Sequence, residues 1–442
     1  MSSTYLPNFS YLFIPFTTEK LDDFSAFRQN IAPKNGWEPV DINNRYLHRY
    51  VAERMTACEN AADCRFRLNP EFAANRQLYL GSKQYSTDPK EYLGELTSGF
   101  QFLISNVEMY AFDKAICILI FELRFPDSDP LKISSAQYNL RKISTEKIHL
   151  DDNTAKPCGE SFVDISQRIL KDCAQGLALD FFFYATPGNE KANFLTYIDV
   201  PWQESYDKEL FYLKWCYSDA FDYDNTHYDA DNENYHANLC TNWGISVSAA
   251  VCLVHRSEKQ KAFIEGTFQK NFRAQYLLTY ILLLHQKYMM YLFLTKLSVG
   301  LEGNLKQLQK YKELLYHFET HYMFSYVSEI PQYQRFYTKI RRIFALEQLF
   351  SGVREPLLQL TEMEKLTAEN EQKNHEQRVN TALTVLSLLT IVSALTDAAG
   401  ITSNLEWMIP AAVAKIIQIA MLAGVIILSI VTFLRLIFLK KR

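Results

Sequence analysis

The sequence has few of the features that mark a secreted protein. Its eight cysteines are scattered without a CxxC pair or a compact framework, which indicates reduced, mostly buried thiols rather than disulfides. Pro7, Asn8 and Pro15 interrupt the N-terminal segment, so no signal peptide is expected. We therefore expect the soluble part of the chain to stay in the cytosol.

Charge of one sign and catalytic motifs are also scarce. The formal net charge of −4 provides no overall basic field, which counts against nucleic acid as the main partner. The chain carries no phosphate loop, no HExxH, no nucleophile elbow and no cysteine with a plausibly placed histidine, so we expect it not to be an enzyme. His317 and His321 have a helical spacing that suits a metal, but such a pair more often packs on a helix face.

Apolar and aromatic residues, in contrast, are abundant. Hydrophobic residues make up 48% and aromatic residues 14% of the 442 residues, enough for two or more folded regions. Helical periodicity predicts a helical region over residues 256–356. Before it, short β-type runs separated by polar turns predict a cytoplasmic, ligand-sensing α/β domain over residues 1–255; they cover residues 11–16, 100–103, 115–123, 179–184 and 244–254.

Residues 276–297 are apolar enough to be mistaken for a membrane span. His285, Gln286 and Lys287 fall together at the centre of this stretch, where polar side chains are expensive in lipid. We therefore predict a buried helix of a soluble domain, whose tyrosines pack against neighbouring helices.

The C-terminal part predicts a membrane anchor of two helices. Residues 381–395 carry no charge, and residues 416–434 approach the roughly 20 apolar residues that cross a bilayer. The segment between them carries Asp397 and Glu406 but no lysine or arginine up to Pro410, whereas basic residues flank the pair. Under the positive-inside rule both termini are cytoplasmic, so we expect a multi-pass protein of the plasma (inner) membrane.

A polar seam follows the helix that enters the first span. We expect a stalk helix continuing into the first span over residues 357–395, an external loop over 396–410, a second span over 411–438 and a basic tail over 439–442. At heptad spacing one side of the stalk predicts a hydrated pore with a hydrophobic gate between several copies, lined by Asn370, Asn374, Gln377, Thr381, Thr384, Leu388 and Ile391. The alternative is a solvated face of a monomeric helix.

This organisation resembles the CorA superfamily of metal-ion transporters. The resemblance covers the whole chain, from the α/β domain through the long helix and the two spans to the basic tail. It implies a homo-pentamer whose first spans surround the pore. The Gly-Met-Asn signature of the family is missing, because the corresponding residues are Gly400, Ile401, Thr402, Ser403 and Asn404. That loss counts against housekeeping magnesium transport, although Asp397 and Glu406 can attract cations or simply keep the loop soluble.

A chain without this signature and with an enlarged cytoplasmic domain is similar to the CorA-like membrane effectors of type III CRISPR systems. The resemblance implies an antiviral channel gated by a nucleotide second messenger, such as SAM-AMP, which is S-adenosylmethionine joined to AMP. A constitutive divalent metal cation transporter, for magnesium or cobalt, is the alternative. A membrane-tethered scaffold without a pore is a third hypothesis.

A nucleotide site needs cations for the phosphate and aromatic or apolar surfaces for the base. Arg141 and Lys142 beside Tyr138 form one such cluster, and Arg124 after an apolar strand is another candidate. Each position also fits a solvated strand end or helix turn.

An acidic segment over residues 219–236 is a candidate metal site. Asp219, Asp222 and Asp224 supply the oxygen ligands that calcium and magnesium prefer. Their spacing fits no EF-hand, so a solvated acidic loop is the alternative. We expect no required cofactor, although the resemblance to CorA implies that bound Mg²⁺ can regulate the pore.

Overall fold

The computed structural model describes residues 7–41, 45–56, 64–75, 92–96, 99–150, 159–181, 191–223, 233–298 and 305–404, together with scattered residues between 412 and 427. The chain divides into two compact units. Unit 1 comprises Met1–Leu301 and Lys306–Leu358, and unit 2 comprises Glu302–Leu305 and Gln359–Arg442.

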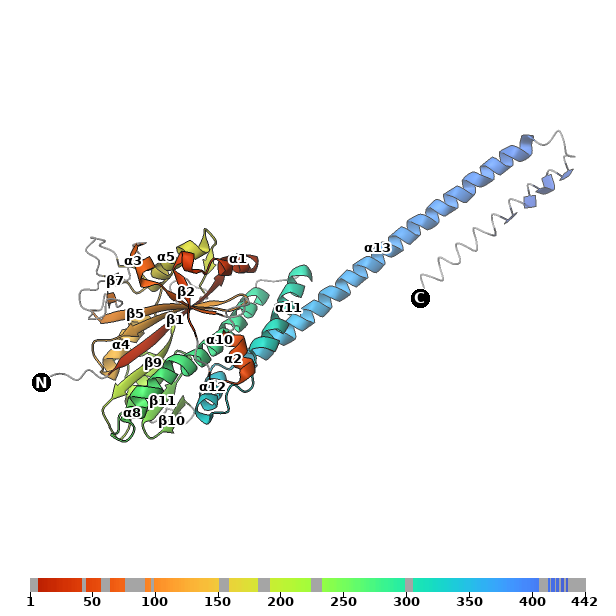
Figure 1. Cartoon of the computed structure of the whole chain (residues 1–442). Coiled ribbons are helices and arrows are strands. Elements are labelled where there is room, and N and C mark those ends of the chain that lie inside the picture. The colour runs from red at the N-terminus through yellow and green to blue at the C-terminus, as the bar shows by residue number, and fades with distance from the viewer. Residues whose placement is uncertain are drawn as a thin grey trace. The chain divides into compact units, whose positions relative to one another are not determined.

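Unit 1 is built around a twelve-stranded sheet (Figure 1). Along its main path the strand order is β10-β11-β12-β9-β1-β6-β5-β3-β2, and all neighbours on this path are antiparallel except the parallel pair β9 and β12. The strands are β1 (Asn8–Thr18), β2 (Trp37–Pro39), β3 (Cys64–Leu68), β4 (Tyr92–Leu96), β5 (Gln101–Ala111), β6 (Cys117–Arg124), β7 (Ile148–Leu150), β8 (Leu179–Asp180), β9 (Asn193–Val200), β10 (Asn234–Asn238), β11 (Thr241–Ile245) and β12 (Ala249–His255).

Helices cover both faces of this sheet (Figure 1). The α-helices are α1 (Phe24–Gln29), α2 (Arg49–Thr56), α3 (Pro70–Asn75), α4 (Pro130–Leu140), α5 (Phe162–Ala174), α6 (Asp207–Trp215), α8 (Lys261–Phe263), α9 (Gln269–Asn271), α10 (Leu277–Ser298), α11 (Leu305–Tyr322), α12 (Pro331–Ile343) and α13 (Leu346–Asn404). Two 3₁₀ turns, η1 (Leu21–Asp23) and η2 (Pro33–Asn35), and two π-helical turns, η3 (Ile264–Phe268) and η4 (Phe272–Tyr276), complete the set in the described residues.

β1 shows why both faces of the sheet are covered. All of its residues are buried, and successive side chains of a strand point to opposite faces. Phe9 and Phe13 contact aromatic rings of η4 and α10, with Phe13 lying 5.2 Å from Tyr280. Phe16 packs on the other face, 5.6 Å from Phe27 of α1. A strand buried on both sides requires a layer of helices on each side.

The structure contains strands at the predicted β-type positions, with two changes of detail. The run over residues 244–254 is two strands, because Ser246 accepts hydrogen bonds from the N–H groups of Ser248 and Ala249 and so turns the chain between β11 and β12. β8 covers only Leu179–Asp180 of the predicted 179–184, and residues 182–184 lie outside the described part.

The helical region does not form a compact unit apart from the sheet. Residues 256–301 and 306–356 belong to unit 1 together with all the strands, so the predicted boundary at residue 255 does not separate two compact units. The physical reason is that α10 and the turns before it cover one face of the sheet. Trp243 of β11, for example, lies 4.8 Å from the rings of both Tyr276 and Phe336.

α10 is buried within unit 1, as predicted. Among the described residues, Lys261–Leu297 is the one helix long and apolar enough to cross a membrane by length and composition, and 89% of its most apolar window is buried inside the protein. Its central polar residues have partners: His285 stacks on Phe112 at 3.7 Å, and Gln286 donates to the carbonyl of Tyr322 at 2.5 Å. This burial is typical of the core helix of a soluble domain.

α13 is longer than predicted at both ends. It begins at Leu346 instead of residue 357 and passes through Pro356, and it continues to Asn404. Residues 396–404 are therefore helical, whereas the sequence predicted that the external loop begins at 396. The sequence allows this extension because no proline interrupts the segment before Pro410.

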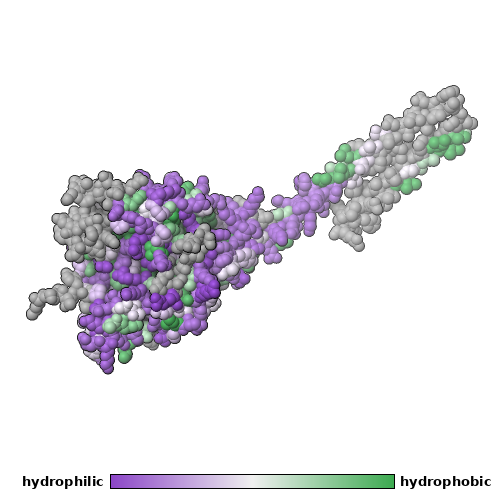
Figure 2. Space-filling view, viewed as in Figure 1, coloured by the Kyte–Doolittle hydropathy of each residue, from purple (hydrophilic) through white to green (hydrophobic). Residues whose placement is uncertain are grey.

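Apolar side chains are exposed along the second half of α13 (Figure 2). Val379, Leu383 and Leu386 are 43–59% exposed, and they follow one another at spacings of four and three residues. They therefore share one face of the helix. The predicted second span, 411–438, and the tail, 439–442, lie largely outside the described residues.

Candidate anion-binding site

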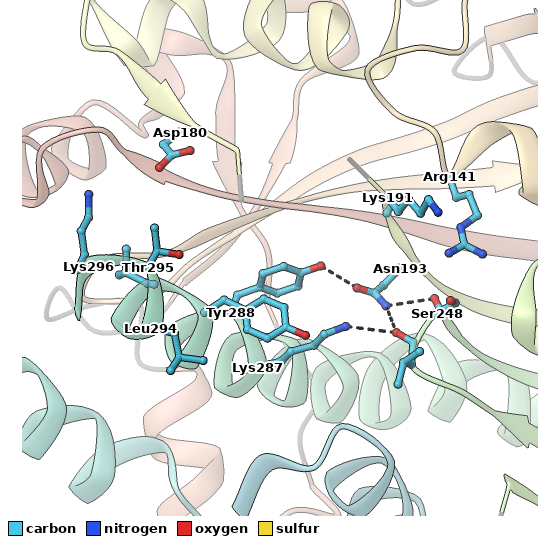
Figure 3. Close-up of a pocket in the computed structure, with 14 residues that line it drawn as sticks. Arg141, Asp180, Lys191, Asn193, Ser248, Lys287, Tyr288, Leu294, Thr295 and Lys296 are labelled. Atoms are coloured by element: carbon cyan, nitrogen blue, oxygen red, sulfur yellow. Dashed lines mark hydrogen bonds between the residues drawn. The ribbon is translucent and has the colours of Figure 1, made fainter. Parts of the chain in front are cut away.

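The candidate site is a pocket of about 620 Å³ in unit 1. It lies where the second half of α10 meets the starts of the parallel strands β9 and β12, the end of α4 and the short strand β8 (Figure 3). Pockets of this volume accept ligands of the size of a nucleotide.

Positive charge predominates on the pocket lining. Four of the lining residues carry cations, whereas Asp180 is the one carboxylate among those that the structure describes; the cations are Arg141, Lys191, Lys287 and Lys296. Figure 3 shows that these charges are spread along the pocket: Arg141 and Lys191 lie at one end, Lys287 near the middle, and Lys296 with Asp180 at the other end. The lining suits an extended, anionic ligand.

Lys287 is the most informative of these residues. Lys287 is only 7% exposed, and its Nζ donates to the carbonyl oxygen of Val247 at 3.2 Å. No carboxylate in the described part of the chain lies within ion-pair distance of this ammonium group. Burial and, to a smaller extent, the charge of the nearby Arg141 together lower the pKa of Lys287 to about 8. A buried cation without a counter-charge is costly, and a bound anion would offset that cost.

Aromatic rings surround the Lys287 side chain. Its Nζ lies 4.6 Å from the ring centre of Phe344, 5.5 Å from that of Tyr288 and 5.8 Å from that of Tyr291. Such contacts stabilise an ammonium group by roughly 0.5–2 kcal/mol, less than a charge-assisted hydrogen bond to a phosphate. Tyr291 is also 38% exposed, so its ring offers a flat surface to a ligand.

Arg141 is a second cation of the pocket, and only part of its guanidinium group is hydrogen-bonded. It caps the C-terminus of α4, and its Nη1 donates to the carbonyl of Trp215 at 2.7 Å. Its Nε is buried without a hydrogen-bond partner in the described residues. An N–H group in this state is available to an anion, and guanidinium groups bind phosphate and carboxylate oxygens through paired N–H groups.

A hydrogen-bond network fixes the wall between α10 and the β11–β12 turn. Tyr288 donates to Asn193 Oδ1 at 2.9 Å, and Asn193 Nδ2 donates to the carbonyls of Val247 and Ser248 at 2.8 and 3.1 Å (Figure 3). Lys287 donates to the same Val247 carbonyl, so the network also positions its ammonium group. The site is therefore held in place before a ligand arrives.

The end of the pocket opposite Arg141 has a mixed character. Burial raises the pKa of Asp180, and the charge of Lys296 opposes that shift. A carboxylate accepts hydrogen bonds from hydroxyl or amino groups, which phosphates lack. The pocket can thus hold a ligand that is anionic along part of its length and carries donors at one end.

The predicted ligand residues are only partly brought together. Arg141 lines the pocket, whereas Lys142, just after the end of α4, pairs with Tyr138 of that helix, with its Nζ 3.9 Å from the centre of the Tyr138 ring. Arg124 lies at the exposed end of β6 and is not among the residues that line the pocket. The sequence cluster therefore contributes one residue of the site.

The predicted metal site lacks support in the described residues. These residues contain no group of three or more potential metal ligands. Asp219 and Asp222 follow α6, where the N–H of Asp219 contacts Ser135 Oγ at 3.4 Å, and Asp224 lies outside the described part.

The predicted pore residues lie on α13. Asn370, Asn374 and Gln377 are exposed in the isolated chain. Thr381 and Thr384 donate their hydroxyls to the carbonyls four residues earlier, each at 2.8 Å, so neither needs a polar partner outside the helix. That removes one reason for placing these two threonines against water. The side chains of Leu388, Ile391 and Asp397, and the whole of Glu406, lie outside the described part.

Sequence reasoning missed Lys287, Lys191, Lys296 and Asp180. A signal for Lys287 was present, because three consecutive polar residues in an apolar helix require specific buried partners. The other three residues come from β8, the start of β9 and the end of α10, and only the fold brings these segments together.

Comparison of the chain with protein-family models, curated proteins and solved structures finds no match. The assignment of a function therefore depends on the residues themselves.

Proposed function

We propose that this chain is a homo-oligomeric, CorA-like membrane effector in which a nucleotide second messenger of the SAM-AMP type binds the pocket and changes the state of a pore lined by α13. Lys287 carries the proposal, because its buried ammonium group has no carboxylate partner in the described residues and faces a pocket with three further cations. The antiviral role of the type III CRISPR kind is proposed on the resemblance of the sequence to CorA-like effectors alone.

The C-terminal sequence supports the membrane part of the proposal. Residues 416–434 are apolar apart from Gln418, and basic residues follow them to the C-terminus. On α13, the predicted pore side of the helix lies opposite the face that carries Val379, Leu383 and Leu386, since helical residues advance by about 100° each. One face can therefore contact lipid or another helix while the opposite face lines a pore.

Ion flux through the purified full-length protein in liposomes tests this function. We expect SAM-AMP to raise the flux at least tenfold, and Lys287→Met to abolish that response because the buried cation is lost. Flux that is equal with and without SAM-AMP would favour a constitutive divalent cation transporter. No flux under any condition would contradict the pore and favour a scaffold.

A substitution in α13 separates the pore from the ligand site. Thr384→Trp should block flux because a bulky side chain obstructs a pore at this position, while SAM-AMP binding should stay unchanged. Leu383→Trp is the matched control on the opposite face and should preserve flux. Equal flux in both variants would contradict the assigned pore side.

A further inference from the structure

Lys287 reaches from the pocket wall to the corner between α12 and α13. Its Nζ lies 4.6 Å from the ring centre of Phe344, which is the C-cap residue of α12. Ala345 follows Phe344, and α13 begins at Leu346. Lys287, the proposed anion-binding residue of the pocket, thus also contacts Phe344 at the end of α12.

The corner has an unusual backbone conformation. Ala345 has a φ of 51°, in the left-handed region that residues with a side chain seldom adopt. Such a conformation persists only where surrounding contacts hold it. Two contacts do so here besides the Lys287 contact with Phe344: Arg341 Nη2 lies 3.6 Å from Glu347 Oε1 across the corner, and the N–H of Ala345 donates to the carbonyl of Arg342 at 3.0 Å.

We propose that Lys287 couples occupancy of the pocket to the α12–α13 corner: a bound anion draws the ammonium group away from the Phe344 ring, and the corner then relaxes. The inference rests on the proposed anion site. Its direction follows from the strengths of the contacts, because an ammonium group binds a phosphate oxygen more strongly than it binds an aromatic face.

The coupling gives the ligand different affinities for two states of unit 1. In one state Lys287 contacts Phe344 and the corner is held; in the other it binds the anion and the corner is released. A ligand shifts a conformational equilibrium only through such a difference in affinity. α13 begins at this corner, so a change there acts on the first turn of the helix that carries the proposed pore residues.

Hydrogen exchange of the full-length protein in detergent micelles tests the coupling without a ligand. The reporter is the amide of Leu349, which donates to the carbonyl of Ala345 at 2.9 Å and so closes the first turn of α13. Lys287→Met and Phe344→Leu each remove the contact by a different route. Both should raise exchange at this amide roughly five- to tenfold.

Lys296→Met is the matched control, because it removes a cation from the same helix and the same pocket without touching Phe344. Exchange at Leu349 should be unchanged in this variant. Unchanged exchange in both Lys287→Met and Phe344→Leu would overturn the coupling, and so would an equal increase in Lys296→Met.

A ligand arm distinguishes this proposal from the proposed function. The probe is the dinucleotide ApA, with binding measured by calorimetry. Binding that raises exchange at Leu349 in the wild type but not in Lys287→Met supports the coupling, even if the protein conducts no ions. Binding without any change at Leu349 overturns the coupling and leaves the anion site intact.

Discussion

Lys261–Leu297 and α13 are both long enough to cross a membrane, but the apolar side chains of the first are buried and many of those of the second are exposed. The first is the more apolar of the two, and unit 1 buries 89% of its most apolar window. α13 is more polar over its length, but it exposes Leu383 and Leu386 by 55% and 59%. The comparison teaches that hydropathy alone does not identify a membrane helix. The apolar residues of a helix can be buried by the rest of the protein as well as by lipid.

Among the substitutions that test this difference between the two helices, Leu284→Asp should have the largest effect on stability. Leu284 is fully buried in α10, and an aspartate there would be a charge without a partner. We expect the free energy of unfolding to fall by more than about 4 kcal/mol, so that little folded protein is recovered. Leu284→Met, which keeps the volume, should lose less than about 1.5 kcal/mol. Chemical denaturation of the purified chain measures both, and a stable Leu284→Asp variant would contradict the burial of α10.

Leu386→Asp asks whether the second half of α13 lies in lipid. An aspartate at the centre of a membrane helix costs about 2.5–3.5 kcal/mol, so the fraction of protein that resists alkaline extraction from membranes should drop. Leu366→Asp is the matched control, since Leu366 is 55% exposed on the polar half of the same helix. Equal retention of the two variants would place neither residue in the membrane.

Binding of ApA to the pocket should weaken as the pH rises from 7 to 9. The pKa of Lys287 is lowered to about 8, so its ammonium group loses its proton over this interval, whereas the phosphodiester does not titrate. The dissociation constant should increase roughly tenfold. The unfolded chain keeps this proton to a higher pH, so the same residue makes the free energy of unfolding rise with pH above about 8.

Lys287→Arg provides the control for this pH dependence. An arginine remains protonated at pH 9, so the variant should bind ApA with an affinity that is nearly independent of pH. A decline as steep as in the wild type would show that a group other than Lys287 titrates.

Lys142→Met should have the smallest effect. Lys142 contacts the ring of Tyr138 on α4 and does not line the pocket, so its loss should cost about 0.5–1 kcal/mol of stability and leave ApA binding unchanged. Calorimetry of the variant checks this, and a loss of binding would restore the site predicted from sequence.

Sequence patterns predicted part of the strands and the burial of α10 because both depend on local patterns. The apolar run of β1 and the polar triplet beginning at His285 are visible in the chain itself, whereas the buried strand β9 was not among the predicted runs. The pocket could not be predicted in the same way. Asn193, Ser248 and Lys287 come from three distant segments, and the parallel pairing of β9 with β12 brings the first two of them to one wall.

Pro356 weakens one turn of α13. A proline inside a helix has no N–H to donate, so the carbonyl of Gly352 lacks its usual partner four residues later. Gly352 has no atom within 4 Å of the place where a side chain would begin, although Val353 and Leu357 on the other side of this turn are fully buried. Unit 1 ends two residues after Pro356, at Leu358. The missing hydrogen bond weakens the helix close to the end of unit 1, so α13 can bend at this turn.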